Sequence, residues 1–319
     1  MLRLLLIIWA LALAAAPASA QSFPNRPITL VVSFAPGGST SIVARAVADK
    51  MGEALGQTVV VENRAGGGGT VGTRQVASSL PDGYTLLLGY TGTLAIAPTL
   101  YPNPGYDPRK SFAPIGLIGN APNSLVVNPS FPAKSVRELI SYAKANPGKV
   151  NMASAGNASA GHLSGELFKM MAGVNLVHVP YRGNGPALTD LLGGQVEVLF
   201  ASLPSSIEYI KAGKLRDLGI TSAKRSEALP DLPTIGEFVP GYEMSAWFGV
   251  GVPKGTPAEV IDKINKEINA ALADPKMKAR FTDLGGIAIG GSPADFGKLI
   301  ADETEKWAKV VRAANIKAD

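Results

Sequence analysis

The chain has 319 residues, a formal net charge of +5 and no cysteine, which excludes disulfides, thiolate metal sites and a cysteine nucleophile. The positive excess is small and scattered, with no basic run, so it argues against nucleic acid as a partner and is compatible with attracting small anions. The 36 glycines and 24 prolines punctuate periodic segments, which is typical of the many turns of an α/β protein.

The first twenty residues are typical of a secretory leader. Arg3 supplies a positive charge, residues 4–16 form a short apolar core, and Ala18-Ser19-Ala20 is a small-residue cleavage site. We therefore predict a signal peptide over residues 1–20, cleavage after Ala20 and export to the periplasm. The apolar core is too short to span a bilayer comfortably, and no cysteine follows it to carry a lipid anchor.

The first unit of the mature chain is predicted to be a strand, a glycine turn and a helix. Residues 28–32 form a continuous apolar run, as in a strand buried on both faces of a parallel sheet. Pro36-Gly37-Gly38 ends the strand, and residues 39–41 offer three candidate N-cap hydroxyls for a helix that reaches Leu55. Unpaired N–H groups at such a helix start, with hydroxyls beside them, suit an anion such as a carboxylate.

Strands and helices then alternate along the chain, which predicts right-handed crossovers and a parallel sheet. The segment 151–171 repeats the opening pattern, with a small-residue loop between strand and helix. Predicted strands cover 58–62, 84–88, 151–154, 176–180, 196–200 and 217–221, and helices cover 70–79, 135–146, 163–171, 186–192, 205–212, 258–272 and 293–314. Residues 115–118 and 247–252 are further apolar runs, and residues 124–128 begin the second lobe.

The chain is predicted to cross between two lobes near residues 119–124 and to return near residues 243–249. Residues 21–121 and 246–319 then form the first lobe, and residues 122–245 form the second. A cleft between lobes is the default place for a ligand.

Two glycine motifs have a functional and a structural interpretation. Residues 67–72 satisfy G-x-G-x-x-G after a strand, but the next strand ends without an acid for a ribose, so we favour close packing of a turn and expect no cofactor. Ser159 lies between glycines with a spacing one residue longer than a nucleophile elbow. His162 and His178 are the two histidines of the chain, so a serine hydrolase stays an alternative and a metal site is not expected.

Single residues leave similar choices open. His162 either lines the loop at a helix start or contacts ligand, and Tyr181 either contacts ligand or packs between lobes. For Arg45, a structural ion pair is favoured over contact with the ligand. Arg182 either reaches the cleft or is solvated.

Short motifs throughout the mature chain resemble, in the same order, the Bug-type periplasmic receptors of tripartite tricarboxylate transporters. Each motif is weak alone, and the ordered set is specific. The motifs are FPNRPI at 23–28, FAPGG at 34–38, ENRAG at 62–66, PDGYTL at 81–86, SAG at 154–156, PYRG at 180–183, GGQV at 193–196, LPDLPT at 229–234 and WAKVV at 307–311.

The resemblance implies an α/β, two-lobed type II periplasmic-binding-protein fold that closes over a small carboxylate. In this family, backbone N–H groups and small hydroxyls hold the carboxylate, partly through water. The family usually has Asp at the position of Ser41 and often an acid near Ala201, and their absence here implies a preference for plain mono- or dicarboxylates over amino acids. The implied ligand-binding residues are Phe34, Gly37, Gly38, Ser39, Thr40, Ser41, Tyr90, Thr91, Thr93, Ser154, Gly156, Asn157, Ser159, His162, Tyr181 and Ser202.

The function predicted from the sequence is therefore capture without catalysis. The protein would bind a small organic carboxylate as a monomer and deliver it to membrane permease subunits through hinge closure. The alternatives are a secreted hydrolase that uses Ser159 and a receptor that presents its ligand to a sensor.

Overall fold

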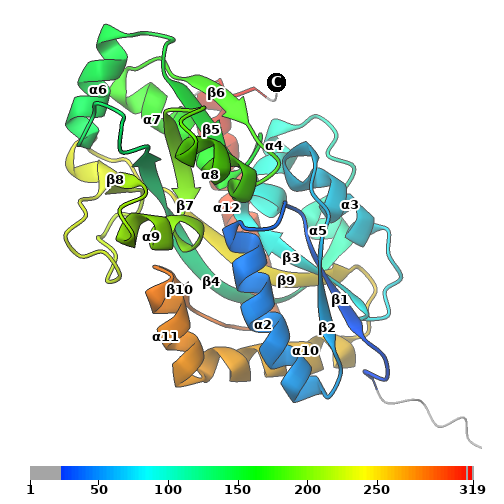
Figure 1. Cartoon of the computed structure of the whole chain (residues 1–319). Coiled ribbons are helices and arrows are strands. Elements are labelled where there is room, and N and C mark those ends of the chain that lie inside the picture. The colour runs from blue at the N-terminus through cyan, green and yellow to red at the C-terminus, as the bar shows by residue number, and fades with distance from the viewer. Residues whose placement is uncertain (1–22, 314, 318–319) are drawn as a thin grey trace, which may run out of the picture.

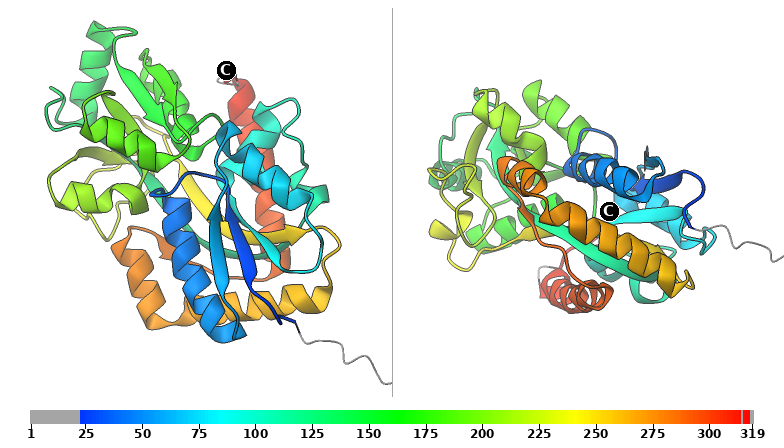
Figure 2. Two further views of the ribbon diagram at one scale, coloured as in Figure 1. Left: turned by 45° about the vertical axis from the view of Figure 1, so that its right-hand side comes forward. Right: turned by 90° about the horizontal axis from the view of Figure 1, so that it is seen from below.

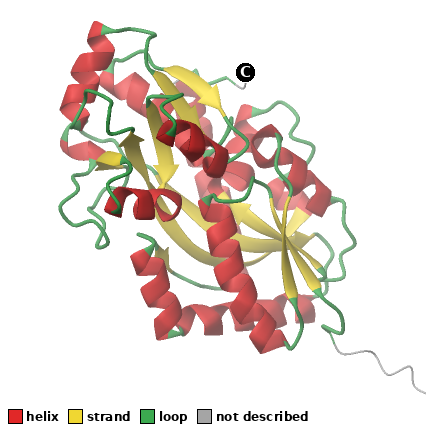
Figure 3. Cartoon of the chain, viewed as in Figure 1, coloured by secondary structure: helices red, strands yellow, loops and turns green. Residues whose placement is uncertain are grey.

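The computed structural model describes residues 23–313 and 315–317, so the predicted signal peptide lies outside the described residues. Ten strands form one curled sheet in the order β2-β1-β3-β9-β4-β7-β5-β6, with β8 and β10 also paired to β4 (Figures 1 and 3). Helices cover both faces of the sheet. The views of Figure 2 place α2 (Ser39–Leu55) and α12 (Pro293–Ala313) on opposite sides of the sheet.

The first part of the sheet contains three parallel strands, because each apolar run returns through a helix. These strands are β1 (Ile28–Val32), β2 (Val59–Asn63) and β3 (Thr85–Tyr90). β9 (Ser245–Pro253) then pairs antiparallel with both β3 and β4 (Phe112–Val127), and β10 (Ile287–Ala288) pairs antiparallel with β4. The helices around them are α3 (Thr70–Ala77), α4 (Ala97–Leu100), α5 (Pro108–Ser111), α10 (Ala258–Ala273) and α11 (Pro275–Asp283).

The second part of the sheet repeats the parallel arrangement. β5 (Asn151–Ser154) lies between β6 (Val177–Pro180) and β7 (Val198–Ser202) and is parallel to both, whereas β7 and β8 (Arg216–Ile220) are antiparallel to β4. The helices here are α6 (Val136–Ala145), α7 (Ala160–Ala172), α8 (Asn184–Leu192) and α9 (Leu203–Lys211). The prediction of a parallel sheet is thus correct for β1–β3 and β5–β7. It is wrong for β4 and β9, the two strands that join the lobes, because they run in opposite directions between the lobes.

β4 connects the two lobes as a single strand of 16 residues. Its first part pairs with β9 as far as Pro122, and its last part, from Asn123, pairs with β7 and β8. Residues 115–118 and 124–128 therefore belong to one continuous strand that crosses from one lobe to the other. Two irregularities of register with β9 lie between Pro114 and Gly119, and Pro122 pairs with Ser245 beyond them.

The hydrophobic core is divided in the same way. The largest cluster of buried side chains comes mainly from residues 28–121 and 244–316, and three smaller clusters all lie within residues 125–242. The boundary predicted after residue 121 falls inside β4, and the boundary predicted after residue 245 falls inside β9. Two bodies therefore meet along a junction that β4 and β9 cross.

The ends of α2 and α6 can be compared with the predicted caps. Gly56 ends α2 in the left-handed conformation, with φ of 65°, as predicted. Ser135 caps α6 by accepting the Glu138 N–H, but the Glu138 carboxylate accepts the N–H of Lys134 rather than that of Ser135, so only half of the predicted capping box forms.

The N-cap predicted for α2 is wrong. The N-cap is Gly38 with an extended backbone, and no side chain caps the helix. Ser39, Thr40 and Ser41 form the first turn instead. The Ser41 hydroxyl accepts a hydrogen bond from Asn63 Nδ2 at 2.6 Å, so it contacts β2 rather than the helix start.

Candidate functional site

The loops that follow the parallel strands of both lobes meet at the junction between the lobes. The Ala35 N–H, after β1, donates to the Arg182 carbonyl, after β6, at 2.9 Å. The Ala160 N–H, at the start of α7, donates to the Tyr90 hydroxyl, at the end of β3, at 3.0 Å. The predicted loops of the two lobes therefore share one junction, as the sequence-based hypothesis requires.

Glycines allow the backbones of the two lobes to approach closely. A Cβ on Gly68 would lie 1.9 Å from the Asn157 carbonyl oxygen, and one on Gly185 would lie 2.2 Å from the Pro36 carbonyl oxygen. Gly68 also has a positive φ of 61°. The glycine motif at residues 67–72 thus serves close packing of a turn, the interpretation favoured from the sequence.

The start of α2 lies buried at this junction. Ser39, Thr40 and Ser41 are all buried, and a Cβ on Gly38 would lie 3.6 Å from Cβ of Asn184, at the start of α8. The helix ladder begins with the N–H groups of Ser41 and Ile42, which both donate to the Gly38 carbonyl. The N–H groups of Ser39 and Thr40 precede that ladder and have no acceptor within it, and the start of α8 lies next to them.

Contacts within the first lobe and across the junction both hold the first loop. Asn63 Nδ2 donates to the Phe34 carbonyl at 2.8 Å, in addition to its bond with Ser41, and so holds the loop against β2. Gly37 has a φ of 84°, and a Cβ there would lie 3.4 Å from Cα of Gly185. Phe34, Gly37 and Gly38 are thus placed at the junction by backbone geometry.

Tyr90 is the aromatic residue at the centre of the junction. Its ring stacks on Phe248, with centroids 5.6 Å apart, and meets Phe34 edge to face at 5.5 Å. Burial raises the pKa of Tyr90 above the ordinary tyrosine value, so the phenol stays neutral. Its hydroxyl accepts from Ala160 and keeps its own proton for donation.

Thr91 and Thr93 brace the turn that follows Tyr90. Thr91 Oγ1 accepts the Trp247 N–H at 2.7 Å, and Thr93 Oγ1 donates to the Tyr90 carbonyl at 3.1 Å. Both side chains are fully buried; Thr91 is the N-cap of a π-helical turn, η2 (Gly92–Ile96), and Thr93 lies within it. Their hydroxyls therefore bind the main chain of their own lobe.

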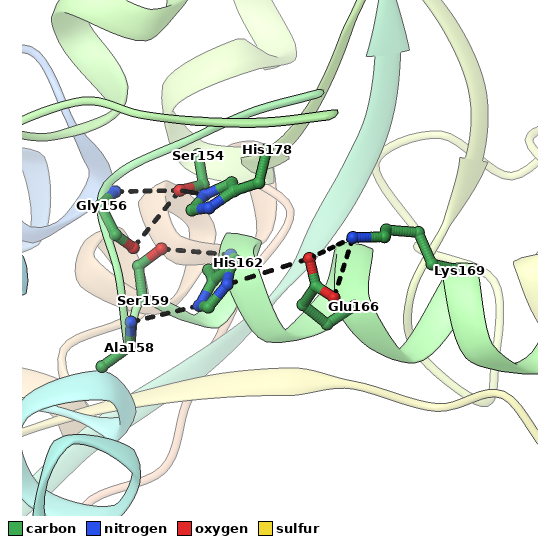
Figure 4. Close-up of polar contacts among 8 residues, drawn as sticks. All are labelled: Ser154, Gly156, Ala158, Ser159, His162, Glu166, Lys169 and His178. Atoms are coloured by element: carbon green, nitrogen blue, oxygen red, sulfur yellow. Dashed lines mark hydrogen bonds and ion pairs between the residues drawn. The ribbon is translucent and has the colours of Figure 1, made fainter. Parts of the chain in front are cut away.

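The loop after β5 is ordered by a serine and histidine network (Figure 4). Ser154 Oγ lies 2.7 Å from His178 Nε2 and accepts the Gly156 N–H at 3.1 Å. Ser159 caps α7 by accepting the His162 N–H at 3.2 Å. Asn157, between them, presents its carbonyl to Tyr101 and Gly68 of the first lobe.

His162 is held as a neutral acceptor. Its Nδ1 accepts the Ala158 N–H at 3.3 Å, and its ring stacks on His178 with centroids 4.2 Å apart. Burial, followed by His178 and Lys169, lowers the pKa of His162 to about 3. Ser159 thus contacts the main chain, and the serine–histidine contact of this loop is made by Ser154 and His178 instead.

Comparison with known proteins decides the family. The family model described as the tripartite tricarboxylate transporter family receptor matches residues 43–316. The chain belongs to this receptor family.

Relatives and solved structures agree with that assignment over nearly the whole chain. BugT of Bordetella pertussis is 41% identical over 305 residues, which are 95% of this chain and 94% of BugT. The periplasmic binding protein BugD superposes with a TM-score of 0.90 at 42% identity and covers 92% of this chain and 99% of its own. The two-lobed periplasmic-binding-protein fold predicted from the sequence is thereby confirmed.

Two further structures of similar proteins contain ligands. Rpa4515 of R. palustris was solved with adipate, with a TM-score of 0.90, 40% identity and coverage of 92% of this chain and 99% of its own. MatC of Rhodopseudomonas palustris was solved with malate, with a TM-score of 0.87, 35% identity and coverage of 91% and 100%. In this receptor, no helix within the described residues is long and apolar enough to cross a membrane.

The remaining residues considered as ligand contacts in the sequence have different hydrogen-bond partners and exposure. The Tyr181 hydroxyl donates to Asp190 at 2.6 Å, and burial together with Asp190 raises the pKa of Tyr181 to about 12. Ser202, at the end of β7, is buried, and its hydroxyl has no hydrogen-bond partner among the described residues. The side chains of Arg45 and Arg182 are exposed, and Arg182 contributes its carbonyl to the junction.

Asn184 is a residue of the receptor site that the sequence prediction missed. It is buried at the first position of α8, and its Oδ1 has no hydrogen-bond partner among the described residues. Its place between Gly183 and Gly185, in the loop after β6, could have indicated this, because glycines there permit the close approach of another chain segment.

Proposed function

We propose that this receptor captures a small mono- or dicarboxylate at the junction between its lobes and delivers it to permease subunits of a tripartite tricarboxylate-type transporter. The observation that carries the proposal is that the starts of α2 and α8 lie next to each other at the junction, a Cβ on Gly38 being 3.6 Å from Cβ of Asn184. First-turn N–H groups and the positive ends of two helix dipoles stabilise an anion placed beside both helix starts.

The chemistry of the surrounding side chains supports an anionic ligand. Hydroxyl groups and one amide are buried at the junction, and none of the sixteen predicted ligand-binding residues is acidic. Ser202 and Asn184 each retain a buried polar atom with no partner among the described residues, so a bound polar solute would satisfy groups that are otherwise costly to bury. The malate and adipate structures of similar proteins support the same ligand class.

Closure of the lobes is the proposed mechanism. Residues 21–121 and 246–319 would move as one lobe and residues 122–245 as the other, with β4 and β9 as the hinge. The bonds Ala35–Arg182 and Tyr90–Ala160 exist when the lobes are together. A ligand that binds both helix starts at once stabilises this closed state, and a permease can recognise that state.

The proposal includes no chemical step and places the protein in the periplasm as a monomer. Ser159 accepts from a main-chain N–H and the His162 ring accepts from another, and these structural contacts support capture over hydrolysis by this pair. Delivery to a permease rests on the receptor family and distinguishes this proposal from presentation to a sensor.

A melting screen of the chain from Gln21 to Asp319 tests the ligand class. A carboxylate present at 100 times its dissociation constant stabilises the folded state by about 2.7 kcal/mol. We expect shifts from one or a few C4–C6 dicarboxylates or related monocarboxylates, and none from the corresponding amides. A panel in which amino acids shift the melting temperature and plain carboxylates do not would contradict the proposal.

A further inference from the structure

A cavity lies in the first lobe, beneath α12. It measures about 180 Å³. Its floor is formed by β3, β4 and β9, its roof by α12, and one side by η2. The walls are apolar side chains, contributed by Leu87, Leu94, Phe112, Phe296 and Ile300. We call this space the α12 cavity.

The α12 cavity exists because glycine occupies its floor. Gly251 of β9 pairs with Leu87 on one side and with Pro114 on the other. Residues paired across strands project to the same face of a sheet, and Leu87 and Pro114 both line the cavity. A Cβ on Gly251 would meet only the Ala113 carbonyl oxygen, at 3.5 Å, so a side chain at this position would extend into the cavity.

Two cations stand at one end of the α12 cavity. Arg109 and Lys254 line it, and both side chains are exposed. The Lys254 N–H donates to the Ser111 carbonyl at 2.9 Å, which brings the end of β9 beside α5, the helix that carries Arg109. Neither cation forms an ion pair with any described residue, and no acidic residue lines the cavity.

The volume of the cavity and the charge of its lining together indicate which class of ligand fits it. An apolar cavity of about 150 Å³ is large enough to hold benzene. A guanidinium and an ammonium at the mouth select a carboxylate, which arginine binds through two parallel hydrogen bonds. We propose that the α12 cavity is a second binding site, separate from the junction between the lobes, for a small aromatic monocarboxylate whose ring lies under α12 and whose carboxylate contacts Arg109 and Lys254.

Calorimetric titration of the full mature chain with benzoate tests the site. We expect Arg109→Ala to weaken benzoate binding about tenfold, because a hydrogen bond to a charged group is lost. Lys254→Ala should weaken it less, and Lys110→Ala should leave it unchanged, because Lys110 is exposed, lies near Asp107 at 3.8 Å and does not line the cavity. Benzamide, which has the same ring without the charge, should bind more weakly than benzoate.

A filling variant separates this site from the junction. Gly251→Leu should abolish benzoate binding and leave binding of the junction ligand intact, whereas Gly185→Ala should weaken binding of the junction ligand and leave benzoate binding intact. If Gly251→Leu fails to fold, the double variant Arg109→Ala/Lys254→Ala changes only exposed side chains and tests the same claim. Benzoate binding that is absent, or that is lost in Gly185→Ala and retained in the Arg109→Ala/Lys254→Ala variant, overturns the proposal.

Discussion

Gly185 and Pro36 come from different lobes and meet with almost no space between them. A Cβ on Gly185 would lie 2.2 Å from the Pro36 carbonyl oxygen, a separation that real Cβ atoms do not tolerate. Gly185 lies in the first turn of α8, and its own helix accepts alanine there without strain. A methyl group at this position therefore opposes only the approach of the lobes.

We predict that Gly185→Ala weakens ligand binding without unfolding the protein. The overpacked contact should destabilise the closed state by about 1–3 kcal/mol, which is about a 5- to 150-fold loss of affinity. Titration calorimetry measures the affinity, and thermal unfolding without ligand measures stability. The matched control is Gly193→Ala, at the far end of α8, where φ is −79° and a Cβ would have no neighbour nearer than 3.4 Å. Equal affinities of the two variants would show that the closed contact is not required for binding.

We predict that Tyr90→Phe also acts on closure. The variant keeps the ring contacts with Phe34 and Phe248 but removes the oxygen that accepts the Ala160 N–H. An amide left buried without an acceptor costs about 1–3 kcal/mol, and this cost falls on the closed state. Hydrogen exchange at the Ala160 amide should accelerate, and ligand affinity should decrease.

Tyr101→Phe is the control for that experiment. The Tyr101 hydroxyl lies 3.5 Å from the Asn157 carbonyl oxygen, at the limit for a hydrogen bond. Its removal should therefore change affinity by less than about 0.5 kcal/mol. A larger loss of ligand affinity in Tyr101→Phe than in Tyr90→Phe would show that the Tyr90 hydroxyl is not the main hydroxyl contact of the junction.

The strand–loop–helix units could be predicted because their signals are local. Apolar runs followed by glycine and hydroxyl residues located β1 and α2, and again β5 and α7, from the sequence alone. Asp274 and Pro275 likewise mark the start of α11, since the Asp274 carboxylate accepts the Lys276 N–H, and this signal was readable although the helix was not predicted.

Other features depend on contacts that no local pattern contains. Ser41 resembles a cap until Asn63, from β2, takes its hydroxyl. Asn184 becomes a buried polar residue only because α2 of the other lobe covers it. The continuity of β4 through Pro122 depends on pairing with β9, more than a hundred residues later in the chain. Each of these three features depends on a tertiary contact, so local sequence propensity could not predict it.

We predict that acid destabilises the receptor through His162. The folded-state pKa of about 3 lies below the ordinary value of 6.5, so the unfolded chain binds a proton more readily. Above pH 6.5 the ring is neutral in both the folded and the unfolded state, and the free energy of unfolding is unaffected. As the pH falls from 6.5 towards 3, the free energy of unfolding decreases by up to about 1.4 kcal/mol for each pH unit. His178, Glu166 and Lys169 are the titratable groups that face the ring.

Chemical denaturation at pH 7 and pH 5 measures this effect. His162→Gln should reduce the difference between the two pH values, because glutamine does not titrate. The nuclear magnetic resonance signal of the His162 ring should stay constant between pH 7 and pH 4.5. A midpoint near 6.5 for that signal would show that the ring is exposed to solvent in the folded protein.

We predict that charge at position 41 sets the preference between plain carboxylates and amino acids. Ser41 lies in the first turn of α2 and accepts from Asn63 Nδ2, a bond that an aspartate carboxylate can also accept. Ser41→Asp therefore preserves the local hydrogen bond and adds one negative charge beside the proposed anion site. Repulsion should weaken dicarboxylate binding about tenfold or more, which is ~1.4 kcal/mol. An ammonium group on the ligand would be attracted by the same charge, so binding of the matching amino acid should increase. Ser41→Asn is the isosteric control without charge, and parallel titrations with succinate and aspartate compare the variants. If Ser41→Asp and Ser41→Asn change both affinities equally, position 41 acts through its shape and not through its charge.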